Sequence, residues 1–318
     1  RASSTGFMAL QKMELLAQPS QAPEPDLAYM APGTLAELLA ARSAHPQAQL
    51  VAGCTDAGLW VTKQHRQFAQ VLDVTRVAEL CRIEETAEHT AIGAAVRLHD
   101  AFAALVRRRP QLQTFAARFA GLPVRNAGTL GGNVANGSPI GDSMPLLIAL
   151  RARVVLASPR GTRELPLEEL YTGYRQNVLA PDEVLAHILV PHPAPGEFLR
   201  AYKVSKRQDD DISAVCLVLN LHLEGGRVQA AAIGAGGVAA VPARARQAEA
   251  ALQGQPWSAA AARRAAEALQ AQFTPLSDMR ASSQYRSALL ASLLQRFWLE
   301  SQGTANASLA TLDLEALA

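Results

Sequence analysis

Residues 128–142 read Gly128-Thr-Leu-Gly-Gly-Asn-Val-Ala-Asn-Gly-Ser-Pro-Ile-Gly-Asp142, and they contain five glycines. Glycine adopts positive φ and lets a ligand approach the backbone, but it loses much conformational entropy on folding, so this density needs a reason. Clustered main-chain N–H groups form a concavity that binds phosphate without a lysine. The alternative is a long surface loop, although loops of this length within a domain are usually functional. The stretch therefore predicts a site for a dinucleotide pyrophosphate.

A second stretch, Leu50-Val-Ala-Gly-Cys-Thr-Asp-Ala-Gly58, has the same character. We expect both stretches to present bare backbone amides at the end of a strand-like segment. Taken alone, this one fits a plain strand-to-helix turn capped by Asp56 equally well. Neither stretch is G-x-G-x-x-G or a P-loop, and no acidic residue follows at the Rossmann spacing. The doubly wound nucleotide-binding fold is therefore not supported.

Composition and charge limit the class of protein. The chain has 318 residues, of which 49% are hydrophobic and 18% charged, which indicates a packed globular protein with more than one core. A net charge of +2 with scattered arginines argues against nucleic-acid binding. No apolar run reaches the ~18 residues of a membrane span, and no signal peptide is visible, so we expect a cytoplasmic protein that does not enter membranes.

The candidate metal ligands form no recognisable site. The cysteines, Cys54, Cys81 and Cys216, lack C-x-x-C spacing, so this chain alone builds no zinc or iron–sulfur site, and their scarcity fits a reducing compartment. The acidic run 209–211 is interpreted as a solvated turn, and we assign no metal. The histidines form no i, i+4 pair and no triad with Ser and Asp, so hydrolase chemistry is not expected, and we interpret them as surface or capping residues.

Hydrophobic periodicity predicts mixed helices and strands. A capping box, Thr34-x-x-Glu37, starts a helix over 34–43. Alternating apolar residues and the Gly225-Gly226 turn predict long antiparallel strands in the last third, the outer part of one strand having a wet face. Residues 1–26 form an N-terminal extension, with a helical patch at 7–16 and a proline-rich linker. We expect strands at 49–52, 71–74, 82–85, 89–93, 153–156, 184–190, 198–205, 212–223 and 227–235, and further helices at 100–108, 111–119, 144–150, 243–252, 259–270 and 283–300.

Four motifs carry a resemblance to a known family. They are the Val-Ala-Gly-Cys-Thr-Asp stretch at 51–56, Phe119-Ala-Gly121, the block 125–145, and the segment from Tyr202-Lys-Val-Ser-Lys to Ile212-Ser213, together with a C-terminal patch at 277–286. Over residues 27–302 the chain resembles the flavin-binding subunits of molybdenum hydroxylases, and most closely the small subunit of bacterial xanthine dehydrogenases. It departs from them at Cys54, where a second glycine is usual, and at Gln208, where an aromatic is common. The N-terminal iron–sulfur region of those subunits is also missing; either it was removed or another chain supplies it.

The resemblance implies an α+β fold. A two-subdomain FAD-binding domain would span 27–195, divided into 27–85 and 86–195. A C-terminal flavoprotein domain would follow at 196–302, and a tail at 303–318.

The resemblance also implies an FAD site. Leu50 to Ala57 would wrap the pyrophosphate, and Thr129 with Gly132 and Asn133 would complete the amide cradle. Asp142 would accept hydrogen bonds from sugar or ribityl hydroxyls. Phe119 and Leu185 would contact the flavin, with Lys203 near its ring system; without the resemblance, a solvated strand residue is the favoured interpretation of Lys203. The complete candidate set is Leu50, Val51, Ala52, Gly53, Cys54, Thr55, Asp56, Ala57, Phe119, Gly128, Thr129, Gly132, Asn133, Asn136, Ser138, Asp142, Leu185 and Lys203.

The implied function is that of an oxidoreductase subunit. The chain would carry the FAD of a xanthine dehydrogenase and pass electrons to NAD⁺, with no catalytic residue of its own beyond the flavin. A molybdenum-cofactor-binding large subunit would oxidise the purine, and 2Fe–2S clusters would lie on a partner chain or the missing region, in a hetero-oligomer. Two alternatives stay open: the flavoprotein of a carbon monoxide, nicotinate or aldehyde dehydrogenase, and a stand-alone FAD-binding module.

Overall fold

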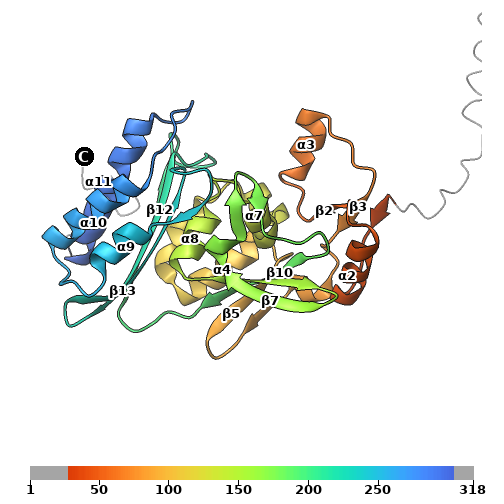
Figure 1. Cartoon of the computed structure of the whole chain (residues 1–318), viewed down its shortest axis with the longest axis horizontal. Coiled ribbons are helices and arrows are strands. Elements are labelled where there is room, and N and C mark those ends of the chain that lie inside the picture. Colours follow the sequence, from red (N-terminus) through yellow and green to blue (C-terminus); the bar gives the residue numbers. More distant parts are fainter. Residues whose placement is uncertain (1–27, 304–318) are drawn as a thin grey trace, which may run out of the picture.

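The structure, a computed structural model, describes residues 28–303, and it arranges them as four sheets with their helices, the smallest sheet being the pair β8-β9 (Figure 1). The extension predicted at 1–26 and all but the first residue of the tail predicted at 303–318 lie outside this range. The strands are β1 Tyr29–Met30, β2 Gln49–Val51, β3 Val71–Asp73, β4 Ile83–Glu85, β5 His89–Gly93, β6 Arg153–Ser158, β7 Gly161–Pro166, β8 Tyr171–Gly173, β9 Gln176–Asn177, β10 Val184–Pro191, β11 Glu197–Val204, β12 Val215–Glu224, β13 Arg227–Gly236 and β14 Ala243–Arg244. The α-helices are α2 Leu35–Ala44, α3 Ala57–Gln64, α4 Leu98–Arg108, α5 Gln113–Ala117, α6 Leu122–Ala127, α7 Leu130–Asn136, α8 Ser143–Ala149, α9 Arg246–Leu252, α10 Ala259–Gln272 and α11 Ser283–Ser301.

The first sheet is small and parallel, in the order β1-β3-β2. Helix α2 begins at the predicted capping box: Thr34 Oγ1 accepts from the Glu37 amide, and Glu37 Oε2 accepts from the Thr34 amide, each at 3.2 Å. Its buried Leu38 joins Leu72 of β3 in the core. Strand β2 ends at Val51 and so delivers residues 50–58, called the first glycine segment from here on, to the edge of the sheet.

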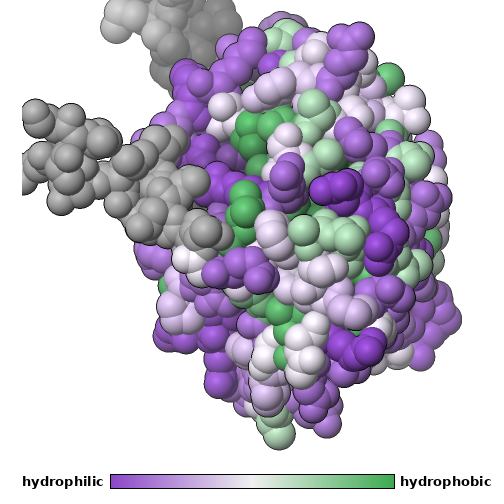
Figure 2. All heavy atoms as spheres, turned by 90° about the vertical axis from the view of Figure 1, so that its left-hand side faces the viewer, coloured by the Kyte–Doolittle hydropathy of each residue, from purple (hydrophilic) through white to green (hydrophobic). Residues whose placement is uncertain are grey.

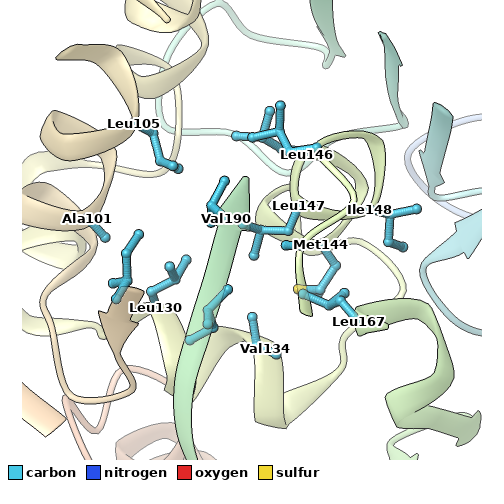
Figure 3. Close-up of a cluster of buried hydrophobic side chains, with 14 of the residues drawn as sticks. Ala101, Leu105, Leu130, Val134, Met144, Leu146, Leu147, Ile148, Leu167 and Val190 are labelled. Carbon is cyan, nitrogen blue, oxygen red and sulfur yellow. The ribbon is translucent and has the colours of Figure 1, made fainter. Parts of the chain in front are cut away.

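The middle sheet is antiparallel, in the order β4-β5-β10-β6-β7. Figure 3 shows its largest cluster, in which Val190 of β10 lies between Leu105 of α4 and Leu147 of α8. The hairpin predicted at 82–93 is confirmed as β4 and β5. The helix predicted over 111–119 is instead a 3₁₀ turn, Pro110–Leu112, followed by the short α5. Strand β7 was not predicted because its exposed residues show no apolar alternation.

Residues 128–142, called the second glycine segment from here on, are neither a loop nor the continuation of a strand. The segment follows helix α6, and residues 130–136 form helix α7, which ends at Gly137 with φ of +59°. Glycine is a poor helix former in isolation. Here Gly131 is required by packing, because a Cβ there would lie 2.4 Å from the Cβ of Ala94. Tertiary contact therefore overrides local propensity. The expectation that this stretch lies at the end of a strand-like segment is wrong.

The C-terminal sheet, β11-β12-β13-β14, is buried on both faces at its centre. Helices α9, α10 and α11 cover one face (Figure 1), where Leu217 and Leu219 of β12 point into their core. Cys216 and Val218, on the opposite face, join the middle core beneath α8. The predicted wet face is therefore restricted to the outer end of β12. Its neighbour β13 carries Gly234, where a Cβ would lie 2.0 Å from the Pro145 carbonyl oxygen of α8.

The helix predicted from residue 243 begins later. Residues 243–244 form the edge strand β14, and the Ala245 amide then donates to the Ile233 carbonyl at 2.8 Å before α9 starts at Arg246. Strand β14 was not predicted because the segment is alanine-rich and lacks β-branched residues.

The arginine run 107–109 lies at the end of α4, and Arg109, its C-cap, turns inward. Its side chain is 3% exposed and binds both carboxylate oxygens of Glu197, at 2.8 and 3.0 Å, as well as the Pro191 carbonyl. This buried ion pair joins α4 to the start of β11. Figure 2 shows that the face carrying α9 to α11 is largely hydrophilic with small apolar patches, and no helix within residues 28–303 is long and apolar enough to span a membrane.

Candidate functional site

A single cavity of about 590 Å³ brings the two glycine segments together. Every candidate residue from the sequence lines it except Gly128, which lies beneath the first segment. The wall also contains residues that sequence reasoning missed, and these are Gln49, Trp60, Val74, Ala94, Leu98, Ala120, Val124, Gly131, Ala135, Ile140, Gly141, Asn177, Leu179, Val184, Asp210, Asp211 and Ile212. Gly131, Ile140 and Gly141 lie within the glycine-rich stretch 128–142. The others come from elements spread over most of the described chain, and no local pattern marks them.

The two segments touch through their backbones at Gly53. A Cβ at Gly53 would lie 1.8 Å from the Ala127 carbonyl oxygen and 2.7 Å from the Gly128 Cα. Real atoms cannot approach so closely, so only glycine permits this contact. The side chain of Asn136 adds a second tie, donating to Asp56 Oδ2 at 3.1 Å. The first segment is thus held against the start of the second and against the end of α7.

The first segment carries the free donors. Within residues 28–303, no acceptor is found for the amides of residues 53–57, which lead into the first turn of α3. Asp56 precedes that helix but makes no side-chain cap bond, because its carboxylate is turned to Asn136. The strand-to-helix turn is therefore present without the predicted cap. Successive unpaired amides at a helix N-terminus favour an anion.

Most backbone amides of the second segment donate hydrogen bonds within the protein. The amides of Leu130 and Gly131 donate to the carbonyls of Val96 and Ala94, and Gly132 donates to Thr129 Oγ1 at 3.0 Å. The Asn133 amide donates to the Thr129 carbonyl at 3.1 Å. This corrects the amide cradle expected from Gly132 and Asn133. The segment instead supplies a close-packed wall and the hydroxyl proton of Thr129.

A buried ionic network borders the cavity at Asp142. Lys203 Nζ and Ser213 Oγ each donate to a different carboxylate oxygen of Asp142, both at 2.6 Å. The side chains of Lys203 and Asp142 are only 3% and 6% exposed. Lys203 is therefore not a solvated strand residue. Because the two charges neutralise each other, this wall is polar but carries no net charge.

The acidic run is also part of the wall. Asp210 and Asp211 line the cavity. Asp209 and Asp210 are also exposed, as expected for a solvated turn. Arg118 holds this loop by donating to the carbonyls of Lys203 and Gln208 and to Ser205 Oγ, at 2.9 to 3.2 Å. At the position where an aromatic residue is common in the family, Gln208 accepts a hydrogen bond from Arg118 through its backbone carbonyl. No group of three or more metal-ligating side chains is found within the described residues.

Cys54 has a strained backbone. Its φ is +56°, in the left-handed region that favours glycine. The subunits that this chain resembles usually have a glycine at this position, and the left-handed backbone explains that preference. Desolvation, and then the nearby carboxylate of Asp73, raise the pKa of the Cys54 thiol above its usual range. The exposed thiol at the cavity wall therefore stays protonated near neutral pH.

The histidines lie outside the cavity wall. His45 and His65 are C-caps of α2 and α3, as the sequence suggested for such residues. His222 lies at the outer end of β12.

Comparisons with known families cover nearly all of the described chain. Residues 24–193 match the model of the FAD binding domain in molybdopterin dehydrogenase, and residues 200–301 match the CO dehydrogenase flavoprotein C-terminal domain. A xanthine dehydrogenase of Drosophila pseudoobscura pseudoobscura is 38% identical over 210 residues, which are 61% of this chain and 16% of the fly protein. A xanthine dehydrogenase/oxidase of Gallus gallus is 30% identical over 244 residues, covering 72% of this chain and 18% of that protein. The chain thus spans about one sixth of the length of these relatives.

Solved structures share the whole architecture. Carbon monoxide dehydrogenase from Hydrogenophaga pseudoflava, in a form lacking the Mo-pyranopterin moiety, superposes with a TM-score of 0.80 at 30% identity, over 86% of this chain and 96% of that chain. Quinoline 2-oxidoreductase from Pseudomonas putida 86 superposes with a TM-score of 0.77 at 28% identity, over 88% and 98%.

The Gly53 contact predicts different outcomes for two neighbouring glycines. Gly53→Ala drives a methyl group into the Ala127 carbonyl, and we expect it to lower the free energy of unfolding by about 1–3 kcal/mol or more. Gly58→Ala, where nothing lies within 4 Å, removes a helix glycine and should raise it by about 0.5–1 kcal/mol. Urea unfolding followed by circular dichroism measures both. Equal effects would contradict the backbone contact.

The Cys54 conformation gives a second prediction. Cys54→Gly relieves the left-handed strain and should raise the free energy of unfolding by about 0.5–1 kcal/mol, part of the ~1–2 kcal/mol strain being offset by glycine's entropy. Cys54→Val should lower it, because a β-branched residue tolerates positive φ poorly. Cys54→Ala removes the thiol but keeps the Cβ, so it serves as the control and should change little. Thermal unfolding of the three variants shows whether this order holds.

Proposed function

This chain belongs to the family of the FAD binding domain in molybdopterin dehydrogenase, and from that premise we propose that it is the FAD-carrying electron-transfer subunit of a xanthine dehydrogenase. In this proposal the chain receives electrons that originate at a molybdenum centre and pass through iron–sulfur clusters, and it delivers them to NAD⁺. Purine oxidation by the proposed enzyme is supported by relatives named xanthine dehydrogenase at 30–38% identity.

The observation that carries the FAD assignment is the row of unpaired amides at residues 53–57 on the wall of the cavity. These donors suit a diphosphate, and the Gly53 contact holds them in place before any ligand binds. A cavity of about 590 Å³ lies within the range of cofactor sites. When bound, FAD supplies the chemistry that joins one-electron iron–sulfur centres to two-electron nicotinamide.

The remaining candidate residues would orient the cofactor. Phe119 and Leu185 provide apolar surface, while Asp142 and Lys203 provide a polar wall without net charge. Asp142 oxygens already accept from Lys203 and Ser213, and their remaining lone pairs suit sugar or ribityl hydroxyls. Asn136 and Ser138 would complete the polar contacts. We assign no proton transfer to this chain.

The proposed assembly follows from the length of the relatives. Because this chain corresponds to about one sixth of those proteins, the molybdenum and iron–sulfur centres of the proposed enzyme would lie on other chains or regions. We therefore propose a hetero-oligomer with a molybdenum-cofactor-binding large subunit and an iron–sulfur domain or subunit.

A second candidate function is the flavoprotein of another molybdenum hydroxylase. The TM-score of 0.80 with carbon monoxide dehydrogenase and the match of residues 200–301 to the CO dehydrogenase flavoprotein C-terminal domain favour this alternative. The identity of a molybdenum subunit that co-purifies with the native chain separates the two.

Cysteine footprinting tests the FAD site within one protein. Cys54 lines the cavity, Cys81 is exposed elsewhere, and Cys216 is buried. Because the pKa of both exposed thiols is raised, alkylation with iodoacetamide is best run at pH 9 or above. FAD at ten times its Kd should slow modification of Cys54 about tenfold and leave Cys81 unchanged, as measured by peptide mass spectrometry. Equal rates at Cys54 with and without bound FAD would refute the assignment.

Reduction by NADH tests the proposed acceptor. The FAD-loaded chain should lose its flavin absorbance on adding NADH and should reduce ferricyanide with NADH as donor. A chain that binds FAD but shows neither response would be a stand-alone binding module. Gly58→Ala, which leaves the cavity wall intact, serves as a matched control for handling and FAD content.

A further inference from the structure

Helix α3 contributes one aromatic ring to the cavity although the helix itself has no buried residue. Figure 1 shows α3 standing away from the sheets. Leu59 and Val61 are 50% and 48% exposed, whereas Trp60 between them is half-buried and lines the cavity. Core packing therefore does not account for a tryptophan at this position.

The neighbours of Trp60 hold its ring in a defined orientation. The Phe68 ring meets it edge-on at 6.4 Å between centroids, and the Arg66 guanidinium lies 5.4 Å from its centroid. The Arg66 amide also donates to the Trp60 carbonyl at 3.0 Å, so the same residue fixes both the backbone and the ring. A preorganised aromatic face loses little entropy when a flat ligand stacks on it.

The described wall of the cavity contains just two aromatic side chains, Trp60 and Phe119. Phe119 is next to Arg118, whose guanidinium binds the loop that begins at Lys203. Trp60 is instead on the side of β2 and β3, and Figure 1 places these strands and α3 away from β12. The amides of residues 53–57, which have no acceptor within the described chain, are separated from Trp60 only by Gly58 and Leu59. An extended dinucleotide likewise has two ring systems with a diphosphate between them.

We propose that Trp60 stacks on the adenine ring of FAD and so makes the site select a dinucleotide over a mononucleotide flavin. This inference rests on the proposed FAD function and adds a residue to it. The isoalloxazine ring then lies on the Phe119 side. Stacking of a base on an aromatic side chain contributes enough to change affinity about five- to 150-fold.

Calorimetric titration of the full chain, stripped of flavin, tests the proposal with three probes: FAD, ADP and FMN. Trp60→Ala should weaken FAD and ADP binding at least about fivefold and leave FMN binding unchanged. Trp60→Phe, which keeps an aromatic face, should recover most of the affinity. Leu59→Ala is the matched control, because Leu59 lies on the same helix, is half exposed and is absent from the cavity wall.

Fluorescence gives a readout that does not depend on redox activity. The other tryptophans, Trp257 and Trp298, pack in the C-terminal core, so Trp60 alone reports on the cavity. ADP should change the emission of the native chain but not that of Trp60→Phe. If the native chain binds FAD and Trp60→Ala loses no affinity, or loses it equally for FMN and ADP, the stacking is overturned while the FAD function stands. If the native chain binds neither FAD nor FMN, both proposals fail.

Discussion

The architecture of the site depends on the contact between Gly53 and the backbone of Ala127 and Gly128. It joins the small parallel sheet to the middle region at a point where no side chain fits. Because the contact involves main-chain atoms on both sides, neither partner can move away by changing a rotamer. The amides that follow Gly53 are therefore held open toward the cavity, and a ligand need not pay the entropy of ordering them.

The two glycine segments use their backbone amides in different ways, although their compositions are similar. Within the described residues, the first segment leaves the amides of residues 53–57 without an acceptor. The second uses most of its amides to form α7 and to donate to the carbonyls of Ala94 and Val96, in the turn that follows β5. Glycine in the second segment serves close packing against Ala94, not exposure of N–H groups. An anion-binding surface and the rigid wall behind it thus arise from the same residue type, through different hydrogen-bond partners.

The C-terminal region takes part in the site through helix α8. This helix lies between the middle core and the face of β12 and β13, and Gly234 lets it approach the sheet closely. The carboxylate of Asp142, at the start of α8, accepts hydrogen bonds from Lys203 of β11 and from Ser213, which lies in the segment before β12. A buried pair of this kind is strongly destabilised when one partner is lost, so it also favours one relative placement of these elements.

Local sequence pattern determined the secondary elements whose signals are short-range: the α2 capping box, the β4–β5 hairpin and the long strands β11 to β13. It also identified residues 50–57 of the first glycine segment, all of which line the cavity, because glycine density and the family motifs are local features. Only the tertiary structure decided that residues 130–136 are helical, that Lys203 is buried against Asp142, and that Trp60 and Asp210 reach the cavity. Each of these depends on contacts between segments far apart in the chain, such as Gly131 with Ala94, and no periodicity within either segment encodes such a contact.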